Sequence, residues 1–255
     1  MRLKDKVTII TGAGQGIGRA YAIGFAKEGA KVVVADINFE NAQKVTGEIF
    51  SLGGEALPVH VDVSDEKSTL DMARQVADKF GRIDVLINNA AIYYGLRLQP
   101  WNSYSVEEWD RVFAVNVRGT WLACKAVVPY MIAQGKGKII NISSGTVVVG
   151  IPFLLHYVTS KAAIVGLTRS LATELGDHGI NVNCIAPGFT MSEASKTMEG
   201  KPPGFDEIVA AMQCFKRSQQ PEDLVGTAIF LASEDSDFIT GQFIAVDGGF
   251  TRSGG

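Results

Sequence analysis

Short apolar runs alternate along the chain with longer segments in which apolar residues recur every three or four positions. The short runs are rich in β-branched residues and lack a regular apolar–polar alternation, which is typical of strands covered on both faces. Strands that alternate with helices predict right-handed crossovers and a parallel sheet. We therefore predict an α/β fold, a single-domain doubly wound parallel sheet over residues 1–255 with helices on both faces. The strands are predicted at residues 7–11, 31–36, 56–61, 85–88, 138–142, 181–185 and 243–246.

Capping signals support two of the predicted helix boundaries, and one long segment departs from the alternation. Ser105 and Glu108 have capping-box spacing ahead of a helical region at residues 107–133. Gly179 follows another helical segment, where glycine supplies the left-handed residue that ends a helix. Residues 191–220 combine Gly and Pro with Met and Phe and have no clear period. An irregular insert of this length is typical of a substrate-binding loop or lid.

The composition is that of an ordinary globular protein, with 46% hydrophobic and 20% charged residues. A net charge of -3 gives no electrostatic reason to expect nucleic acid or an anionic membrane as a partner. Cys124, Cys184 and Cys214 are odd in number and far apart, which fits reduced thiols better than disulfides, and no Cys/His cluster has metal spacing. The first apolar run is too short for a signal peptide or a membrane span. We therefore expect a cytoplasmic protein without a metal.

A glycine-rich loop follows the first predicted strand. The sequence TGAGQGIG at residues 11–18 fits the spacing T-G-x-x-x-G-x-G rather than G-x-G-x-x-G. Without side chains, the backbone of such a loop can approach a pyrophosphate at a helix N-terminus. A tight turn is the alternative interpretation of the loop taken by itself.

Asp36 strengthens the case for a dinucleotide. It ends the second predicted strand, about 20 residues beyond the loop, where a carboxylate can accept hydrogen bonds from both ribose hydroxyls. The same carboxylate would repel a 2′-phosphate, and neither Gln15 nor Ile37 supplies a compensating cation. Arg19 is basic, but it lies in the first helical turn and has little weight. We predict NAD rather than NADP; a solvated strand end is the alternative for Asp36.

Tyr157 and Lys161 stand four residues apart and share one face of a predicted helix. A phenol titrates near 10, so acting as a base near neutrality requires a drop of about three pKa units, roughly 4 kcal/mol. A nearby cation can supply much of that drop, as can the positive ring of oxidised nicotinamide. An isolated Y-x-x-x-K is more often a surface Tyr with an unrelated Lys, so its interpretation depends on the rest of the chain.

From Lys6 to about Phe250 the chain resembles the short-chain dehydrogenase/reductase family, whose fold is of the Rossmann type. The resemblance implies an NAD-dependent oxidoreductase. It rests on TGAGQGIG at 11–18, DV at 62–63, NNAA at 88–91, VNVRG at 115–119, INISS at 140–144, YVTSK at 157–161, APG at 186–188 and FITGQFIAVDGG at 238–249.

By this resemblance, Ser144 hydrogen-bonds the substrate oxygen, Tyr157 exchanges its proton, and hydride passes between the substrate carbon and C4 of NAD. Lys161 would bind the nicotinamide ribose, and Asn116 would hold a water beside it. Ser143 should be structural, because neighbouring strand residues point to opposite faces. The cofactor groove would be formed by Gly12, Gln15, Gly16, Ile17, Gly18, Asp36, Ile37, Asp62, Val63, Asn89, Ala90, Tyr157, Lys161, Pro187, Gly188, Phe189, Thr190 and Ser192.

Two positions depart from the family pattern. Ala91 replaces a Gly, which should cost a little backbone freedom and no chemistry. Ser192 stands where Thr is common, so either Thr190 or Ser192 would contact the nicotinamide carboxamide.

The substrate residues are expected in segments 92–95, 145–155 and 191–213. They are largely apolar and aromatic, which favours a hydrophobic aryl or cyclic secondary alcohol and its ketone, although each could equally belong to the core. Lys196, Glu199 and Lys201 are expected to be solvated, and His156 to be a surface residue of its helix. The residues singled out are Tyr93, Tyr94, Val147, Phe153, Leu154, Met191, Met198, Phe205 and Met212.

Several alternatives stay open within and beyond the family. A 3-oxoacyl-thioester reductase would share the catalytic residues but would normally use NADPH, against Asp36. A pyridoxal-type alcohol dehydrogenase is a further possibility. The intact set of Asn116, Ser144, Tyr157 and Lys161 argues against a non-enzymatic NAD-binding scaffold, and sugar-nucleotide epimerases or dehydratases are usually longer. The resemblance also implies a homotetramer with D2 symmetry.

Overall fold

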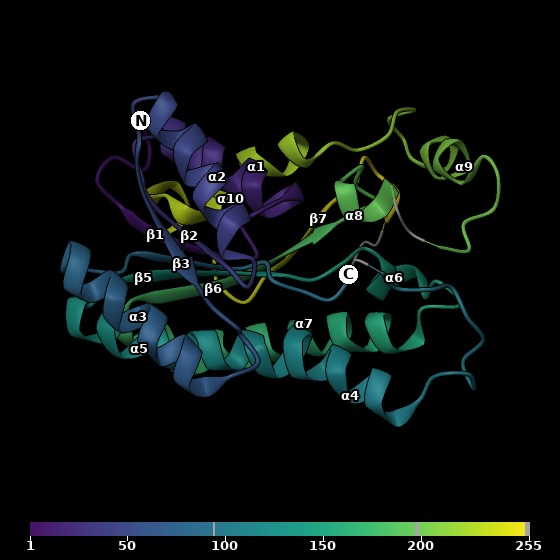
Figure 1. The fold of residues 1–255 in the computed structure, drawn as a ribbon, viewed down its shortest axis with the longest axis horizontal. Coiled ribbons are helices and arrows are strands. Elements are labelled where there is room, and N and C mark those ends of the chain that lie inside the picture. The colour runs from purple at the N-terminus through teal and green to yellow at the C-terminus, as the bar shows by residue number, and fades with distance from the viewer. Residues whose placement is uncertain (94, 197–198, 253–255) are drawn as a thin grey trace.

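The computed structural model describes residues 1–93, 95–196 and 199–252. Seven strands form one parallel sheet in the order β3-β2-β1-β4-β5-β6-β7, which confirms the predicted fold class (Figure 1). The order reverses at β1, which pairs with both β2 and β4, and a crevice at such a reversal is where α/β sheets bind ligands. The strands are β1 (Val7–Thr11), β2 (Lys31–Asp36), β3 (Glu55–His60), β4 (Val85–Asn88), β5 (Gly137–Ile142), β6 (Ile180–Pro187) and β7 (Phe243–Val246).

Helices cover both faces of the sheet, as Figure 1 shows. Apolar clusters fill both interfaces, one containing Ile10, Val34 and Phe25 and the other containing Ile9 and Val127. This two-sided burial explains why the strands lack polar–apolar alternation. On one face lie α1 (Gly16–Lys27), α2 (Phe39–Ser51) and α10 (Val225–Ala232), and on the other α3 (Glu66–Phe80), α4 (Val106–Phe113), α5 (Thr120–Gln134) and α7 (Leu155–Leu175).

The predicted helical region at residues 107–133 is interrupted by a π-helical turn, Ala114–Gly119, between α4 and α5. Ser105 does cap α4, because its Oγ accepts the Glu108 N–H at 3.1 Å. The second half of the predicted capping box is wrong, since the Glu108 carboxylate accepts a hydrogen bond from Gln99 Nε2 at 3.0 Å instead. A π-turn inside a helix often marks a functional position.

The segment at residues 191–220 holds two short helices beyond the carboxyl ends of the strands (Figure 1). They are α8 (Glu193–Lys196) and α9 (Phe205–Met212), and α6 (Thr146–Val149) lies near the same end of the sheet. Further single turns of 3₁₀ helix are Gly176–His178, Pro221–Leu224 and Glu234–Ser236.

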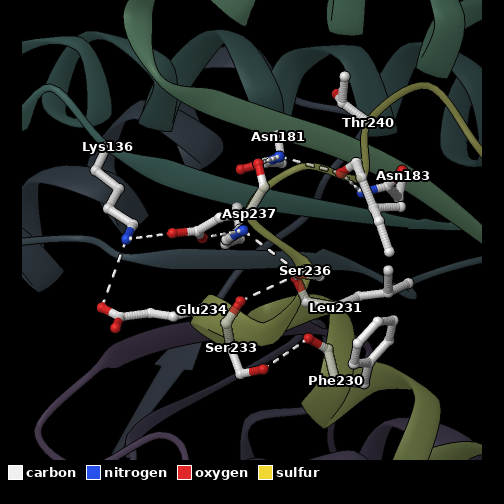
Figure 2. A network of polar contacts seen from close by, with 12 residues as sticks. Lys136, Asn181, Asn183, Phe230, Leu231, Ser233, Glu234, Ser236, Asp237 and Thr240 are labelled. Carbon is white, nitrogen blue, oxygen red and sulfur yellow. Dashed lines mark hydrogen bonds and ion pairs between the residues drawn. The ribbon is translucent and has the colours of Figure 1, made fainter.

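A polar network fastens the opposite end of the sheet, where β5 and β6 begin (Figure 2). Lys136 Nζ lies 3.0 Å from Asp237 Oδ2 and 3.5 Å from Glu234 Oε1. Lys138, which is buried, lies 2.7 Å from Asp237 Oδ1, and its hydrogen bond is the main cause that lowers the pKa of that carboxyl. A buried cation needs such a partner, so this cluster is structural.

All three cysteines are free, with Cys124 and Cys184 buried and Cys214 exposed. Among the residues that the structure describes, no group of His, Cys, Asp and Glu is arranged to hold a metal ion. Within the same residues, no helix combines the length and apolarity needed to cross a membrane.

Candidate active site

A cavity of about 1100 Å³ runs along the carboxyl ends of the strands. All the predicted cofactor residues line it, and so do Ser144, Tyr93, Phe153 and Leu154. Asn116 and Met191 are not among the lining residues. Tyr94 and Met198 lie outside the described residues. The structure thus brings the predicted cofactor residues and the catalytic candidates Ser144, Tyr157 and Lys161 to one continuous space.

The glycine loop is held against the residues that follow β4. Gly12 has a φ of 63°, and a Cβ there would lie 2.8 Å from the Cα of Ala90, so this position requires glycine. Asn89 Nδ2 donates to the carbonyls of Thr11 and Gly12, each at 3.0 Å. No side chain caps the N-terminus of α1, which begins at Gly16, so its first N–H groups fit an anion such as a pyrophosphate.

Asp36 is held in place by two backbone donors. Its Oδ2 accepts the Gly14 N–H and its Oδ1 accepts the Asn38 N–H, both at 2.8 Å. Arg19, the nearest basic candidate in the sequence, is paired with Glu48, with Nε 3.0 Å from Oε1. The Asp36 carboxylate is therefore fixed beside the glycine loop, at the edge of the cavity.

Tyr157 and Lys161 are both buried on α7 and face the cavity. Lys161 Nζ donates to the Ile142 carbonyl at 2.8 Å and lies 5.8 Å from the centre of the Tyr157 ring. Burial lowers the pKa of Lys161 to about 8. Burial also raises the pKa of Tyr157 to about 12, although a hydrogen bond with Ser144 opposes this. Desolvation therefore dominates the pKa of Tyr157 in the protein alone, and an acidic phenol in the presence of Lys161 and bound NAD stays a prediction.

The hydroxyls of the INISS segment have separate tasks. Ser144 Oγ lies on the cavity and is 3.0 Å from Thr146 Oγ1. Ser143 Oγ donates to the Lys161 carbonyl at 2.8 Å, which agrees with its predicted structural role and fixes α7 to the end of β5.

Asn116 is buried within the π-helical turn, behind the cavity. Its Oδ1 accepts the Ile92 N–H at 2.7 Å, and its Nδ2 donates to Ser160 Oγ at 3.0 Å. The side chain therefore joins the π-turn to the loop after β4 and to α7. The water that it would hold beside Lys161 stays a prediction.

Thr190 and Ser192 both line the cavity, so the choice between them stays open. Thr190 Oγ1 lies 3.1 Å from Gln219 Oε1 and 3.2 Å from the Gly188 carbonyl. Ser192 lies against the glycine loop, since a Cβ on Gly16 would be 3.4 Å from its Cβ.

Aromatic rings surround the end of the cavity beyond Tyr157. The Tyr93 ring centre is 5.2 Å from that of Tyr157, and Phe189 meets Phe205 edge-on at 5.2 Å. Lys201 was expected to be solvated, which is wrong. Its side chain is largely buried, with Nζ 3.2 Å from Asp206 Oδ1 and 5.5 Å from the centre of the Phe189 ring.

His156 was expected at the surface of its helix, and this is also wrong. The side chain is completely buried, packed against the Tyr104 ring at a centroid distance of 4.1 Å. Burial lowers its pKa, while Glu108 opposes that shift. The reason is the packing of α4 and its preceding loop on the start of α7, which the local sequence does not reveal.

Several further residues line the cavity that no sequence motif singled out. Some come from the loop after β4 and from α4, and Phe250 follows β7, where the carboxyl end of the last strand reaches the site. Val61 is the last residue of the strand predicted at 56–61, so the carboxyl ends of the predicted strands are the signal that could have found it. The missed residues are Val61, Ser64, Leu98, Pro100, Arg111, Val115, Ile142 and Phe250.

A family model described as enoyl-(acyl carrier protein) reductase matches residues 12–251. The 3-oxoacyl-[acyl-carrier-protein] reductase of Thermotoga maritima is 39% identical over 249 residues, covering 98% of this chain and 99% of its own. The chain belongs to the short-chain dehydrogenase/reductase family. Galactitol 2-dehydrogenase of Agrobacterium fabrum is 42% identical, with 98% of each chain covered. A (2S)-[(R)-hydroxy(phenyl)methyl]succinyl-CoA dehydrogenase subunit of Thauera aromatica is 36% identical, again over 98% of each chain.

Two solved structures of the family carry different nicotinamide cofactors. The 3-ketoacyl-(acyl-carrier-protein) reductase of Brucella melitensis, complexed with NADH, has a TM-score of 0.90 and 33% identity, covering 98% of this chain and 99% of that one. Gluconate 5-dehydrogenase of Burkholderia cenocepacia, with NADP and tartrate, has a TM-score of 0.92 and 33% identity, covering 99% and 97%. This short-chain dehydrogenase/reductase is therefore a nicotinamide-dependent oxidoreductase that acts on an alcohol or its ketone.

Proposed function

We propose that this enzyme interconverts a hydrophobic secondary alcohol and its ketone, with NAD as cofactor and Tyr157 as acid and base. The observation that carries the proposal is that Ser144, Tyr157 and Lys161 line the same cavity as the glycine loop and Asp36. Position and electrostatics are what a protein contributes to such a reaction.

The substrate oxygen would lie between the hydroxyls of Ser144 and Tyr157. In oxidation the tyrosinate takes the alcohol proton, and in reduction the neutral phenol donates it. Bound nicotinamide supplies or accepts the hydride. Because burial raises the pKa of Tyr157 to about 12, we infer that the phenol ionises only beside a second positive charge, such as that of the oxidised ring. Lys161 would bind the nicotinamide ribose, and Asn116 would hold a water beside Lys161.

The preference for NAD rests on Asp36. Its carboxylate lines the cavity beside Gly14, and Arg19 is occupied by Glu48. A 2′-phosphate at this place would meet a negative charge. Asp62 and Val63 would form the adenine end of the groove.

The lining near Tyr157 supports the proposed substrate class, because many of its side chains are apolar or aromatic. A polyol needs a hydrogen-bonding partner for each of its hydroxyls, which apolar side chains do not supply. An aryl or cyclic substituent fits aromatic walls, and the Thauera relative is named for a substrate with a hydroxy(phenyl)methyl group. A pyridoxal-type alcohol dehydrogenase stays an alternative to this proposal. The supporting residues are Ile92, Tyr93, Leu98, Ile151, Phe153, Leu154, Phe189, Phe205 and Val209.

Residues 191–220 would act as a lid over this end, within a single domain that spans 1–255. Phe205 and Val209 of α9 line the cavity, and Ser192, which precedes α8, lies against the glycine loop. We also propose a cytoplasmic location, supported by the three free thiols.

A 3-oxoacyl-thioester reductase is the second candidate, favoured by the identity to the Thermotoga enzyme. Cofactor preference does not separate the two, because the Brucella reductase was solved with NADH. A panel of alcohols and ketones, with turnover followed by NADH absorbance, separates the two candidate functions. We expect kcat/KM for 1-phenylethanol or cyclohexanol to exceed that for galactitol by at least ~10-fold. A preference for galactitol, or for reduction of an acetoacetyl thioester, would overturn the proposed substrate class.

A further inference from the structure

Phe153 has an unusual backbone at the mouth of the cavity. Its φ of 66° lies in the left-handed region, which residues with a Cβ rarely adopt. The side chain is 53% exposed and lines the cavity. A strained conformation of this kind persists only where neighbouring contacts hold it, and it is frequent at ligand clamps.

Two donors from one loop hold the Phe153 carbonyl. Tyr104 Oη donates to it at 2.8 Å, and the Gln99 N–H donates to it at 3.1 Å. Both donors precede α4, so the loop after β4 fixes the backbone of the loop after β5. The ring of Phe153 is thereby directed by contacts that belong to another segment.

Tyr104 is itself held by the buried ring of His156. Its ring packs on His156, whose Nε2 lies 3.5 Å from Glu108 Oε1. The Glu108 carboxylate also accepts both hydrogen bonds of Gln99 Nε2, at 3.0 and 3.1 Å. Gln99, Glu108, His156, Tyr104 and the Phe153 carbonyl form one connected arrangement beside Tyr157. Its position explains why a histidine is buried next to the candidate acid/base.

We propose that Tyr104 is a positioning residue, which acts through the Phe153 carbonyl to hold the Phe153 ring as the outer wall of the substrate site. The inference rests on the proposed function, since it concerns how a bulky alcohol is selected. The wall would contact the aryl or cyclic substituent and would leave a small alcohol untouched. Tyr104 would therefore affect KM for a bulky substrate rather than the chemical step.

The test is a double-mutant cycle with Tyr104→Phe and Phe153→Ala. Tyr104→Phe removes one hydroxyl and keeps the ring on His156. The two probes are 1-phenylethanol and 2-butanol, and NAD binding is measured separately by protein fluorescence. Tyr130→Phe on α5, away from the cavity lining, is the matched control.

We expect Tyr104→Phe to raise KM for 1-phenylethanol at least ~5-fold, with kcat, NAD binding and the kinetics of 2-butanol within about two-fold of wild type. The effect should disappear in the Phe153→Ala background. An unchanged KM, a loss confined to kcat, or the same loss in both backgrounds would overturn the inference. No turnover of any secondary alcohol by wild type would instead overturn the proposed function, and this inference with it.

If the Tyr104→Phe variant does not fold, a comparison of Phe153→Gly with Phe153→Ala tests the same inference. Phe153→Gly and Phe153→Ala both lack the ring, so both should lose the preference for 1-phenylethanol over 2-butanol. The glycine variant should melt at the higher temperature, because glycine adopts the left-handed conformation without strain. If both variants kept the wild-type preference for 1-phenylethanol over 2-butanol, the Phe153 ring would not be a wall of the substrate site.

Discussion

The carboxylate of Asp36 accepts the backbone N–H of Gly14 at 2.8 Å. The end of β2 and the glycine loop are thus joined by the group proposed to select the cofactor. A Cβ on Gly14 would lie 2.9 Å from Asp36 Oδ2, so the contact depends on a bare backbone. The shape of the glycine loop and the proposed recognition of the ribose therefore both depend on Asp36. A substitution at Asp36 reports on cofactor recognition only if it leaves the shape of the loop unchanged.

Asp36→Asn meets that condition for the Gly14 contact, because an amide oxygen can still accept the Gly14 N–H, while the amide NH2 gives up only the second contact, with the Asn38 N–H. We expect the ratio of kcat/KM for NAD to that for NADP to fall at least ~10-fold, since the negative charge that opposes a 2′-phosphate is removed. The ratio is measured with one alcohol and both cofactors. Asp78→Asn, on the exposed face of α3, is the control and should leave the ratio unchanged. Wild-type preference for NADP would contradict the assignment.

Tyr157→Phe removes the proposed acid/base and keeps the ring. We expect kcat to fall by about 10²–10⁴-fold while NADH binding, followed by fluorescence, stays near the wild-type value. Tyr130→Phe should retain full activity. Turnover of Tyr157→Phe within ten-fold of wild type would remove Tyr157 from the mechanism.

The raised pKa of Tyr157 gives a separate spectroscopic prediction. Because burial places this pKa at about 12, the wild-type minus Tyr157→Phe difference spectrum should show no phenolate up to pH 10 in the protein alone. Saturating oxidised NAD should bring the phenolate signal to lower pH, because it adds positive charge beside the ring. A phenolate signal near neutral pH without NAD would mean that Lys161 alone lowers the pKa of Tyr157 enough for the phenol to ionise.

Much of this site could be predicted because its signals are local. The glycine loop, Asp36 and the strands at 31–36 and 85–88 depend on spacing and apolar runs within a few residues. The left-handed Phe153 and the buried His156 depend on Tyr104 and Glu108, which lie about 50 residues away in the chain and meet them only in the folded protein.

The same reasoning explains Lys201 and the π-helical turn. Lys201 is charged and sits in a Gly- and Pro-rich segment, so the sequence favours solvent, yet Phe189 and Asp206 cover it. The turn at Ala114–Gly119 places Asn116 between Ile92 and Ser160, and apolar periodicity carries no information about those partners.

Lys161 should make the stability of the protein depend on pH in a defined direction. Its folded pKa is about 8, below the ordinary value of 10.5. Below pH 8 the ammonium is buried in its charged form at full cost. Above pH 8 the folded protein releases that proton before the unfolded chain does, so the cost fades towards pH 10.5.

We therefore expect wild type to gain about 2 kcal/mol of unfolding free energy relative to Lys161→Met between pH 7.5 and pH 9.5. Urea titrations at the two pH values measure the difference. Lys138→Met is the contrasting variant. It removes one of the two cations that pair with Asp237, leaving Lys136, and should be less stable than wild type at both pH values. A constant difference between wild type and Lys161→Met would show that Lys161 is not buried as a cation.

The proposed tetramer predicts a sensitive position on the outer face of α5. Trp121 is 46% exposed there, with Lys125 Nζ 5.3 Å from its ring centre. We expect light scattering to give about four chain masses for wild type and a smaller assembly for Trp121→Glu, because a buried carboxylate would oppose the contact. Trp101→Glu is the matched control: Trp101 is 74% exposed in the loop before α4, and its replacement should leave the mass unchanged. A monomeric wild type, or equal masses for the two variants, would reject this interface.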